Sequence, residues 1–172
     1  MTVKTILTEP NPQLRQVSKS VEKVGKAEQK LMDDMLETMY AANGIGLAAI
    51  QIGVPKRIIV MDIGKDVEKK EPRYFINPII KNKNASKSIY EEGCLSVPNQ
   101  FAEIERPKKC EVEYLDYNGK KKFLLAEGLL ATCIQHEMDH LEGILFIDYL
   151  SKLKKSMIIK KLSKIKSTRI VV

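Results

Sequence analysis

The chain has only two histidines, and they lie four residues apart, at His136 and His140. Residues at this spacing project from one face of a helix, one turn apart. Glu137 completes the pattern His-Glu-x-x-His, in which two imidazoles bind a metal ion and the carboxylate serves as a base. The sequence therefore predicts a helix from Glu127 to about Leu141 that holds a divalent ion.

A catalytic metal site has three protein ligands and one open position for water. Since no histidine is left, the third ligand must be a cysteine or a carboxylate. Cys110 lies in an alternating stretch typical of a core strand, and Cys133 is about 10.5 Å along the helix axis from His140. Cys94 follows Gly93, which allows a backbone or a substrate to approach closely. The spacing favours Cys94, and a buried structural cysteine is the alternative.

The segment from Gly44 to Gln51 reads Gly-Ile-Gly-Leu-Ala-Ala-Ile-Gln. Its small residues allow close backbone contacts, and Gln51 can place a side-chain amide in a cleft. It is not a phosphate loop, which ends in Gly-Lys-Ser or Gly-Lys-Thr. Ala49 also replaces the third glycine of the dinucleotide-binding pattern. Taken alone, the segment indicates a tightly packed turn.

A chain of 172 residues fits one domain that can fold without disulfides. It has no apolar run near the roughly 18 residues of a membrane span, and its first ten residues lack the apolar stretch of a secretory signal. Three cysteines are too few for a disulfide framework and indicate a reducing compartment. We therefore expect a cytoplasmic protein that does not associate with a membrane.

The order of predicted elements indicates an α+β fold in a single domain over residues 1–172. Apolar spacing predicts a helix over 26–42, ended by Asn43-Gly44, and a buried strand over 57–62. A strand over 74–80 is expected to break at Pro78. Strands over 110–117 and 121–125 flank Asn118-Gly119, which predicts a two-residue hairpin turn. Gly143 is expected to end the helix that carries the histidines.

The positive charge lies at the C-terminal end of the chain. The net charge is +7, but residues 151–172 hold eight Lys and Arg and no acid, so residues 1–150 are close to neutral. Apolar residues at helical spacing, from Leu150 to Ile165, predict an amphipathic helix in this segment. This distribution argues against a protein whose whole surface binds nucleic acid.

Three segments together resemble the signatures of peptide deformylases. These are the segment from Gly44 to Gln51, the sequence Glu-Gly-Cys-Leu-Ser from Glu92 to Ser96, and His-Glu-Met-Asp-His from His136 to His140. The resemblance implies a peptide deformylase fold, with antiparallel or mixed sheets around a central metal-binding helix and a C-terminal amphipathic helix.

The resemblance also implies roles for individual residues. Its metal ligands would be Cys94, His136 and His140, with Glu137 as the catalytic carboxylate. The side chain of Gln51 and the backbone N–H of Leu95 would stabilise the oxyanion. A pair between Arg106 and Asp139 would brace the metal helix.

The implied reaction removes the formyl group from N-formylmethionyl nascent peptides and releases formate. The peptide is expected to lie extended against Ile45, Gly46 and Gly93, with Leu129 and Cys133 lining the methionine pocket. The implied metal is Fe²⁺ in the cell, although Zn²⁺, Ni²⁺ and Co²⁺ suit the same ligands. Phe101 stands where many bacterial relatives have arginine, so the preference for residues after methionine is left open.

Two rival functions share part of this pattern. A zinc endopeptidase also has His-Glu-x-x-His, but Phe146 occupies the position of the third histidine of the extended protease motif. A structural-zinc domain that binds RNA needs a fourth protein ligand.

For the basic helix, one interpretation is a solvated face, and the other, implied by the resemblance, is contact with the ribosome. We expect a monomer.

Overall fold

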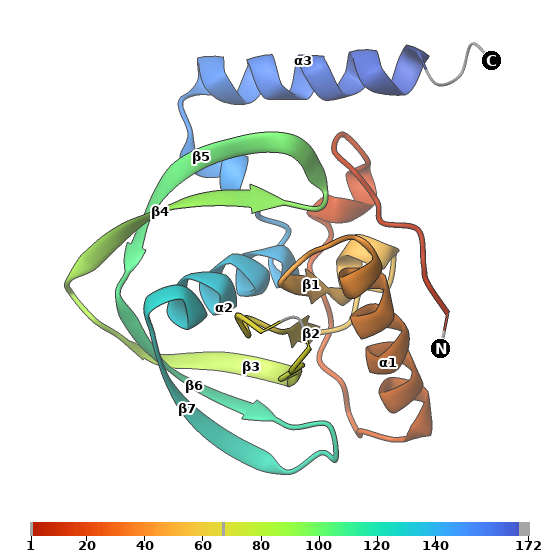
Figure 1. Cartoon of the computed structure of the whole chain (residues 1–172), viewed down its shortest axis with the longest axis vertical. Coiled ribbons are helices and arrows are strands. Elements are labelled where there is room, and N and C mark those ends of the chain that lie inside the picture. Colours follow the sequence, from red (N-terminus) through yellow and green to blue (C-terminus); the bar gives the residue numbers. More distant parts are fainter. Residues whose placement is uncertain (1, 67, 169–172) are drawn as a thin grey trace.

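The computed structural model describes residues 2–66 and 68–168 of the chain (Figure 1). Its α-helices are α1 (Lys26–Ala41), α2 (Gly128–Leu141) and α3 (Lys152–Thr168), and its short 3-10 helices are η1 (Pro12–Arg15), η2 (Ala49–Ile52) and η3 (Phe146–Tyr149). Its strands are β1 (Gly46–Ala48), β2 (Ile58–Met61), β3 (Arg73–Lys83), β4 (Lys87–Cys94), β5 (Val97–Pro107), β6 (Lys109–Leu115) and β7 (Lys121–Glu127). None of the described helices combines the length and apolarity needed to cross a bilayer.

The strands form two antiparallel sheets that enclose a helix. The larger sheet has the order β1-β2-β3-β6-β7, and β4 pairs with β5 in the smaller one. Figure 1 shows α2 between the two sheets, with α1 beside β1 and β2 and with α3 across β5. The predicted α+β fold with a central helix is confirmed, and the pairs between these strands are all antiparallel.

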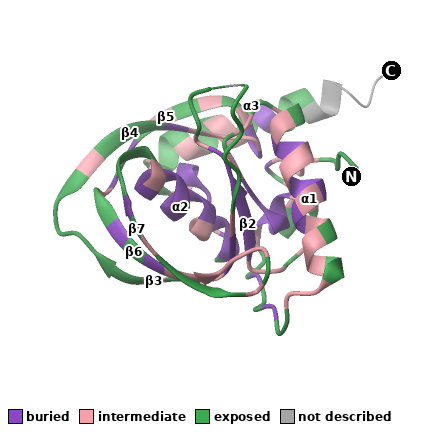
Figure 2. Ribbon diagram, turned by 60° about the horizontal axis from the view of Figure 1, so that its bottom comes forward, coloured by how far each residue is buried: buried purple, intermediate pink, exposed green. Residues whose placement is uncertain are grey.

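The central helix α2 is buried on most of its surface. Nine of its fourteen residues are buried, including both histidines and Glu137 (Figure 2). The predicted stop at Gly143 is confirmed: this residue has φ +72°, and a Cβ there would collide with the backbone oxygen of Arg15. Burial on both sides explains why apolar residues are not confined to one stripe of this helix.

Helix α1 packs its methionines against β1 and β2. Met32, Met35 and Met39 are fully buried in one cluster with Leu47 and other residues of these strands. The helix ends where Asn43-Gly44 predicts, and the left-handed residue is Asn43, at φ 56°. Gly44 serves packing instead, because a Cβ there would come 2.6 Å from the side chain of Leu95.

The expected break at Pro78 does not occur. β3 runs through Pro78 to Lys83, and its register with β6 shifts between Ile76 and Ile79. Asn77 has φ 49°, and its side-chain amide exchanges two hydrogen bonds of 2.8 Å with the backbone of Val21. Because a bulge leaves one residue out of the ladder, the proline is accommodated without ending the strand.

The turn between β6 and β7 is longer than the two residues predicted. The strands end at Leu115 and resume at Lys121, and the N–H of Asp116 donates to the carbonyl of Lys120. Gly119 has φ +80°, whereas Asn118 has no positive φ, so the predicted two-residue turn is wrong. The carboxylate of Asp116 accepts from the N–H groups of Asn118 and Lys120, which favours the wider loop.

Helix α3 confirms the predicted amphipathic segment as far as Thr168; residues 169–172 lie outside the described part. Ile158, Ile159 and Leu162 join a cluster that includes Val97 of β5. Leu153, Met157 and Ile165, which the apolar spacing also placed on the apolar face, are exposed. Cys94 packs against the same cluster. The C-terminal helix is therefore attached to the strands that surround the predicted metal ligand.

Candidate metal centre

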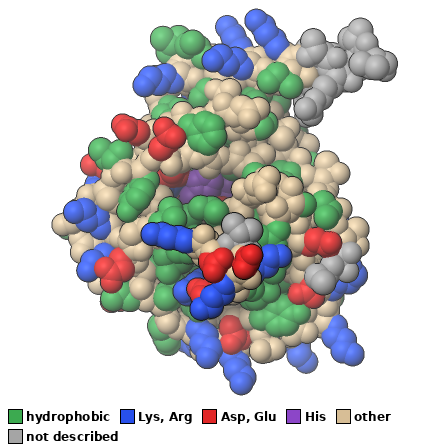
Figure 3. All heavy atoms as spheres, viewed as in Figure 1, with side chains coloured by type: hydrophobic (Ala, Val, Ile, Leu, Met, Phe, Trp, Pro, Cys, Tyr) green, Lys and Arg blue, Asp and Glu red, His purple; other side chains and the backbone are tan. Residues whose placement is uncertain are grey.

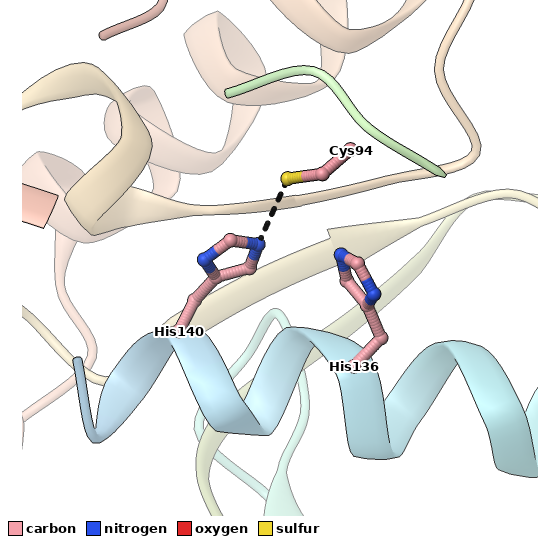
Figure 4. A group of neighbouring side chains, drawn as sticks. All are labelled: Cys94, His136 and His140. Carbon is pink, nitrogen blue, oxygen red and sulfur yellow. Dashed lines mark hydrogen bonds between the residues drawn. The ribbon is translucent and has the colours of Figure 1, made fainter. Parts of the chain in front are cut away.

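Cys94, His136 and His140 come together at the centre of the molecule (Figure 4). One potential ligand atom from each lies within 4.8 Å of the others, and Sγ of Cys94 is 3.3 Å from Nε2 of His140. A tetrahedral ion bonded at about 2.3 Å to sulfur and about 2.1 Å to nitrogen holds its ligand atoms about 3.5 Å apart. The three side chains therefore have the chemistry and the spacing to hold a divalent ion.

The ligands come from two elements that are distant in sequence. The histidines are one turn apart on α2, with ring centroids 5.1 Å apart. Cys94 ends β4, at a shift of register after Gly93, and pairs with Val97 across a tight turn. Neither Cys110, which is buried in the main core, nor Cys133 belongs to this group. The structure thus brings together the three residues that the sequence favoured.

His136 is oriented by Glu92, a residue of β4 to which the sequence analysis assigned no role. Its Nδ1 lies 2.8 Å from Oε1 of Glu92, so Nε2 is left to face the other ligands (Figure 4). Burial would lower the pKa of His136, but hydrogen bonds to Cys94 and Glu92 outweigh it and raise the pKa well above its usual value. A carboxylate on the distal nitrogen is the usual support of a metal-binding histidine.

Arg106 holds Glu92 and the metal helix together. Its guanidinium donates two hydrogen bonds of 2.7 and 2.9 Å to Glu92 and one of 2.9 Å to Asp139. The predicted pair between Arg106 and Asp139 is therefore present. Tyr149 adds a hydrogen bond of 2.8 Å to the same carboxylate of Asp139, and the guanidinium lies 5.0 Å from its ring. This network fixes β4, β5, α2 and η3 relative to one another.

The surroundings of His140 favour the neutral imidazole that a metal ligand needs. It is 1% exposed, and its Nδ1 has no hydrogen-bond partner among the described residues. Burial, together with the charges of His136 and Arg106, lowers the pKa of His140 well below its usual value. Neutral imidazole is the form that binds metals, so this environment fits the donor set.

Glu137 lies beside this group, and its carboxylate forms no ion pair with the residues that the structure describes. It is 6% exposed, and its Oε2 has no hydrogen-bond partner among the described residues. Burial raises the pKa of Glu137 to about 7. A carboxylate that gains and loses a proton near neutral pH is suited to general acid–base catalysis.

A cleft of about 550 Å³ leads to this group. Figure 3 shows a histidine at the bottom of the hollow in the centre of the face. Of the residues proposed for substrate binding or catalysis, those lining the cleft are Ile45, Gly46, Gln51, Gly93, Leu95, Leu129, Cys133 and Glu137. Exposed apolar side chains of Ile45, Tyr90, Phe101 and Leu129 surround it. An extended peptide with one apolar side chain fits a cleft of this kind.

The amide of Gln51 is directed toward the metal ligands. Its Nε2 lies 3.6 Å from Sγ of Cys94 and 3.0 Å from Oγ of Ser96. Leu95 lies between these two residues, in the turn that joins β4 to β5. Both residues proposed as oxyanion donors, Gln51 and Leu95, thus line the cleft beside Cys94.

Some residues of the site were missed by the sequence analysis, and one of them was open to prediction. Glu92 lies two residues before Cys94 in the predicted extended segment, and residues two apart share a face of a strand, so this spacing could have placed Glu92 near the metal group. Tyr149 and Ser96 offered no such signal, because their partners belong to other elements.

Comparison with known proteins agrees with this geometry. The family model for polypeptide deformylase matches residues 3–156. Peptide deformylase from Pelagibacter ubique is 81% identical over 172 residues, covering all of both chains, and that from Rhizobium meliloti is 56% identical over 98% of this chain and 97% of its own. The crystal structure of peptide deformylase from Ehrlichia chaffeensis matches with a TM-score of 0.94 and 44% identity, covering 99% of this chain and all of that one.

A second Ehrlichia chaffeensis structure, in complex with actinonin, matches with a TM-score of 0.92 and 47% identity over 95% of this chain and 98% of that one. The predicted resemblance is thus confirmed by sequence and by fold, and the zinc endopeptidase alternative is not favoured. The chain belongs to the peptide deformylase family.

Proposed function

We propose that Cys94, His136, His140 and Glu137 carry out the reaction of this deformylase, the removal of the N-formyl group from nascent peptides. The proposal rests on one observation: a buried carboxylate with a pKa near neutrality lies beside three metal-binding side chains at the bottom of a cleft. The family match does not favour a zinc endopeptidase. A structural-zinc domain would also need a fourth ligand, and the group of described residues has three.

A divalent ion held by these three side chains would supply the Lewis acidity that makes water a nucleophile near neutral pH. One thiolate and two imidazoles suit iron, cobalt, nickel and zinc alike. From the family resemblance we assign Fe²⁺ to the enzyme in the cell, and we expect Zn²⁺, Ni²⁺ or Co²⁺ in preparations made in air. Metal analysis of protein purified without oxygen tests this assignment.

Glu137 moves the proton in this scheme. Its carboxylate takes a proton from the attacking water and delivers it to the nitrogen of the departing methionine. The bond between the formyl carbon and that nitrogen breaks, and formate leaves with the oxygen of the water. A pKa near 7 allows the group to act first as base and then as acid.

Gln51 and Leu95 stabilise the charge that grows on the formyl oxygen. The side-chain amide of Gln51 and the backbone N–H of Leu95 are the assigned donors, on the side of the group where Cys94 lies. Donors fixed before the reaction lower the barrier without reorganising during it.

The methionine side chain enters the apolar part of the cleft between Leu129 and Cys133, while the peptide backbone lies along Ile45, Gly46 and Gly93. The glycines leave room for the peptide to approach the strands. Sheets often bind peptides in this way, with the peptide extended beside an edge strand such as β4.

The experiment that tests these roles measures formate released from formyl-Met-Ala-Ser by protein purified without oxygen. We expect turnover by the wild type and none by Glu137→Ala, with the metal content unchanged. Turnover by Glu137→Ala would remove Glu137 from the mechanism. We also propose that actinonin binds this cleft, as it binds the Ehrlichia chaffeensis enzyme; a thermal shift on adding actinonin checks binding separately from chemistry.

We propose that helix α3 contacts ribosomal RNA. We also propose that the enzyme is cytoplasmic and monomeric. Lys152, Lys154, Lys160 and Lys161 are exposed on it, and the described part of the helix has no acidic residue (Figure 3). Phosphate contacts weaken as salt rises. The alternative is a solvated face.

Changing these four lysines to Gln tests the contact better than deleting the helix, which would also remove Leu162 from the cluster against which Cys94 packs. We expect the wild type to sediment with ribosomes at low salt and the Gln variant to lose this. Sedimentation that depends neither on the salt concentration nor on the four lysines would favour the solvated face. Sedimentation equilibrium of the isolated protein tests whether it is a monomer in solution.

A further inference from the structure

Ser96 is a fully buried serine whose hydroxyl contacts the side chain of Gln51. Its Oγ accepts a hydrogen bond of 3.0 Å from Nε2 of Gln51, and both residues are at most 1% exposed. Ser96 follows Leu95 in the turn after β4, whereas Gln51 lies in η2. The hydrogen bond therefore joins two segments that are 45 residues apart.

The amide of Gln51 is held at both of its ends. Its Oε1 accepts a hydrogen bond of 2.9 Å from the N–H of Ala48, which fixes which end of the amide carries the nitrogen. Nε2 then donates one hydrogen to Ser96 and lies 3.6 Å from Sγ of Cys94. An amide nitrogen has two hydrogens, so the bond to Ser96 directs the second one toward the metal group.

The backbones of both residues are tied to the same N-terminal segment. The N–H of Leu7 donates to the carbonyl of Gln51 at 2.7 Å, and the N–H of Glu9 donates to the carbonyl of Ser96 at 2.8 Å. Leu7 and Glu9 are only two residues apart. This arrangement leaves little freedom for Gln51 and Ser96 to move relative to each other.

We propose that Ser96 is a positioning residue that aims the second N–H of Gln51, which here contacts Sγ of Cys94, at the formyl oxygen. The proposal rests on the oxyanion role of Gln51 given under Proposed function. Without the hydroxyl, a buried N–H loses its acceptor and the amide can rotate away from its productive direction. The effect should therefore appear in the chemical step and should pass entirely through Gln51.

A double-mutant cycle tests this. The variants are Ser96→Ala, Gln51→Met, which keeps the length of the side chain but removes the amide, and their combination. We expect Ser96→Ala to lower kcat by about tenfold, less than the loss of a whole oxyanion donor, with KM and metal content little changed. In the Gln51→Met background, Ser96→Ala should have no further effect.

Each other outcome overturns the proposal in a distinct way. If Ser96→Ala lowers kcat equally in both backgrounds, Ser96 supports the fold and does not act through Gln51. If Gln51→Met is slow and Ser96→Ala is normal, this inference alone is wrong. Full turnover by Gln51→Met would also remove the oxyanion role assigned to that residue.

The control is Ser18→Ala. Ser18 is also buried, and its hydroxyl has no hydrogen-bond partner among the described residues, so its removal should leave kcat unchanged. Thermal unfolding and metal content are measured for each variant. Ser96→Gly, at the same turn position, repeats the cycle if the alanine variant does not fold.

Discussion

The carboxylate of Glu137 lies directly against Gly46. A Cβ built on Gly46 would come 2.5 Å from Oε1 of Glu137 and 3.0 Å from its carboxyl carbon. Gly46 begins β1, next to the cleft, so the strand can pass this close only because the residue has no side chain. The position of the proposed base is therefore set by a glycine in another motif.

Gly46→Ala is expected to push the carboxylate of Glu137 out of place. Displacement of a catalytic group by about 1 Å can reduce turnover about 100-fold. We expect kcat to fall by 10- to 100-fold, roughly on that scale, while the metal content stays unchanged. Gly25→Ala is the control, because a Cβ there meets its nearest neighbour at an ordinary 3.6 Å. Normal turnover by Gly46→Ala would mean that the carboxylate has room to adapt.

The raised pKa of Glu137 predicts a pH-dependent stability of the metal-free protein. Burial raises the pKa from the ordinary 4.5 to about 7, so the folded state binds this proton more tightly than the unfolded chain. The stability linked to the group is fully present below about pH 4.5 and is lost as pH rises through about 7. Glu137→Gln cannot ionise, so we expect it to exceed the wild type at pH 8 by roughly 1–3 kcal/mol.

Urea unfolding of both proteins between pH 4 and pH 8, in the presence of a chelator, measures this difference. The two proteins should converge near pH 4, where the wild-type carboxyl is protonated. A difference that is the same at every pH would mean that the ionisation of Glu137 does not carry the effect.

Arg106→Met is expected to weaken both the fold and the metal site. It leaves the carboxylates of Glu92 and Asp139 without their buried partner, which typically costs about 3–5 kcal/mol. Because Glu92 supports His136, the metal affinity should fall by about 10- to 100-fold. Urea unfolding and competition with a chelator measure the two effects.

The control for Arg106→Met is Lys109→Met, which removes an exposed ion pair with Glu127. A surface pair of this kind contributes about 1 kcal/mol or less. Equal losses in the two variants would show that the buried network has no special weight.

Cys94→Ala should abolish stoichiometric metal binding, whereas Cys110→Ala should preserve it. Cys94 supplies the sulfur of the metal group, and Cys110 is buried in the main core, where burial raises the pKa of its thiol. Metal analysis after dialysis, with formate release alongside, distinguishes the two. We also expect a chelator to stop wild-type turnover and added Fe²⁺ to restore it. Metal bound equally by both variants would exclude Cys94 as a ligand.

Phe101 predicts a preference for apolar side chains after the formylmethionine. It is 66% exposed at the cleft, and its ring fills the space that a side chain at Gly93 would occupy. The described residues that line the cleft include no Lys or Arg, and Glu91 is among them. An acidic peptide side chain therefore meets no positive partner here.

We expect kcat/KM for formyl-Met-Ala-Phe to exceed that for formyl-Met-Ala-Asp, and Phe101→Ser to reduce the ratio several-fold. Phe123→Ser is the matched control, since Phe123 is 71% exposed on β7 and does not line the cleft. A ratio that is unaffected by Phe101→Ser would assign the preference to other residues.

Local patterns in the sequence were sufficient to predict the helices and to place His136 and His140 on one face of a helix. The spacing of His136 and His140 and the stop at Gly143 depend on residues that are neighbours along the chain. The identity of the third ligand, Cys94, needed the family resemblance, because spacing alone left a structural cysteine as an alternative. The same holds for the pair of Arg106 with Asp139.

The failures share a different cause. At Pro78 and at Asn118-Gly119 the local signal was clear, but side-chain hydrogen bonds changed the outcome. The side chain of Asn77 bonds to Val21, 56 residues away, and supports the bulge that carries Pro78. Asp116 caps the turn that follows it. Long-range or competing side-chain contacts of this kind cannot be predicted from the periodicity of apolar residues.

The network of Glu92, Arg106, Asp139 and His136 has a consequence for the divergence of this family. Glu92, Arg106 and His136 are buried and Asp139 is half-buried, so replacing one of them leaves a charged or polar group of the others without its partner. A lineage can change this set only through several substitutions at nearly the same time, whereas an exposed residue such as Phe101 can be exchanged by itself. We therefore expect single substitutions to be tolerated at the rim of the cleft, at positions such as Phe101, and not in this network.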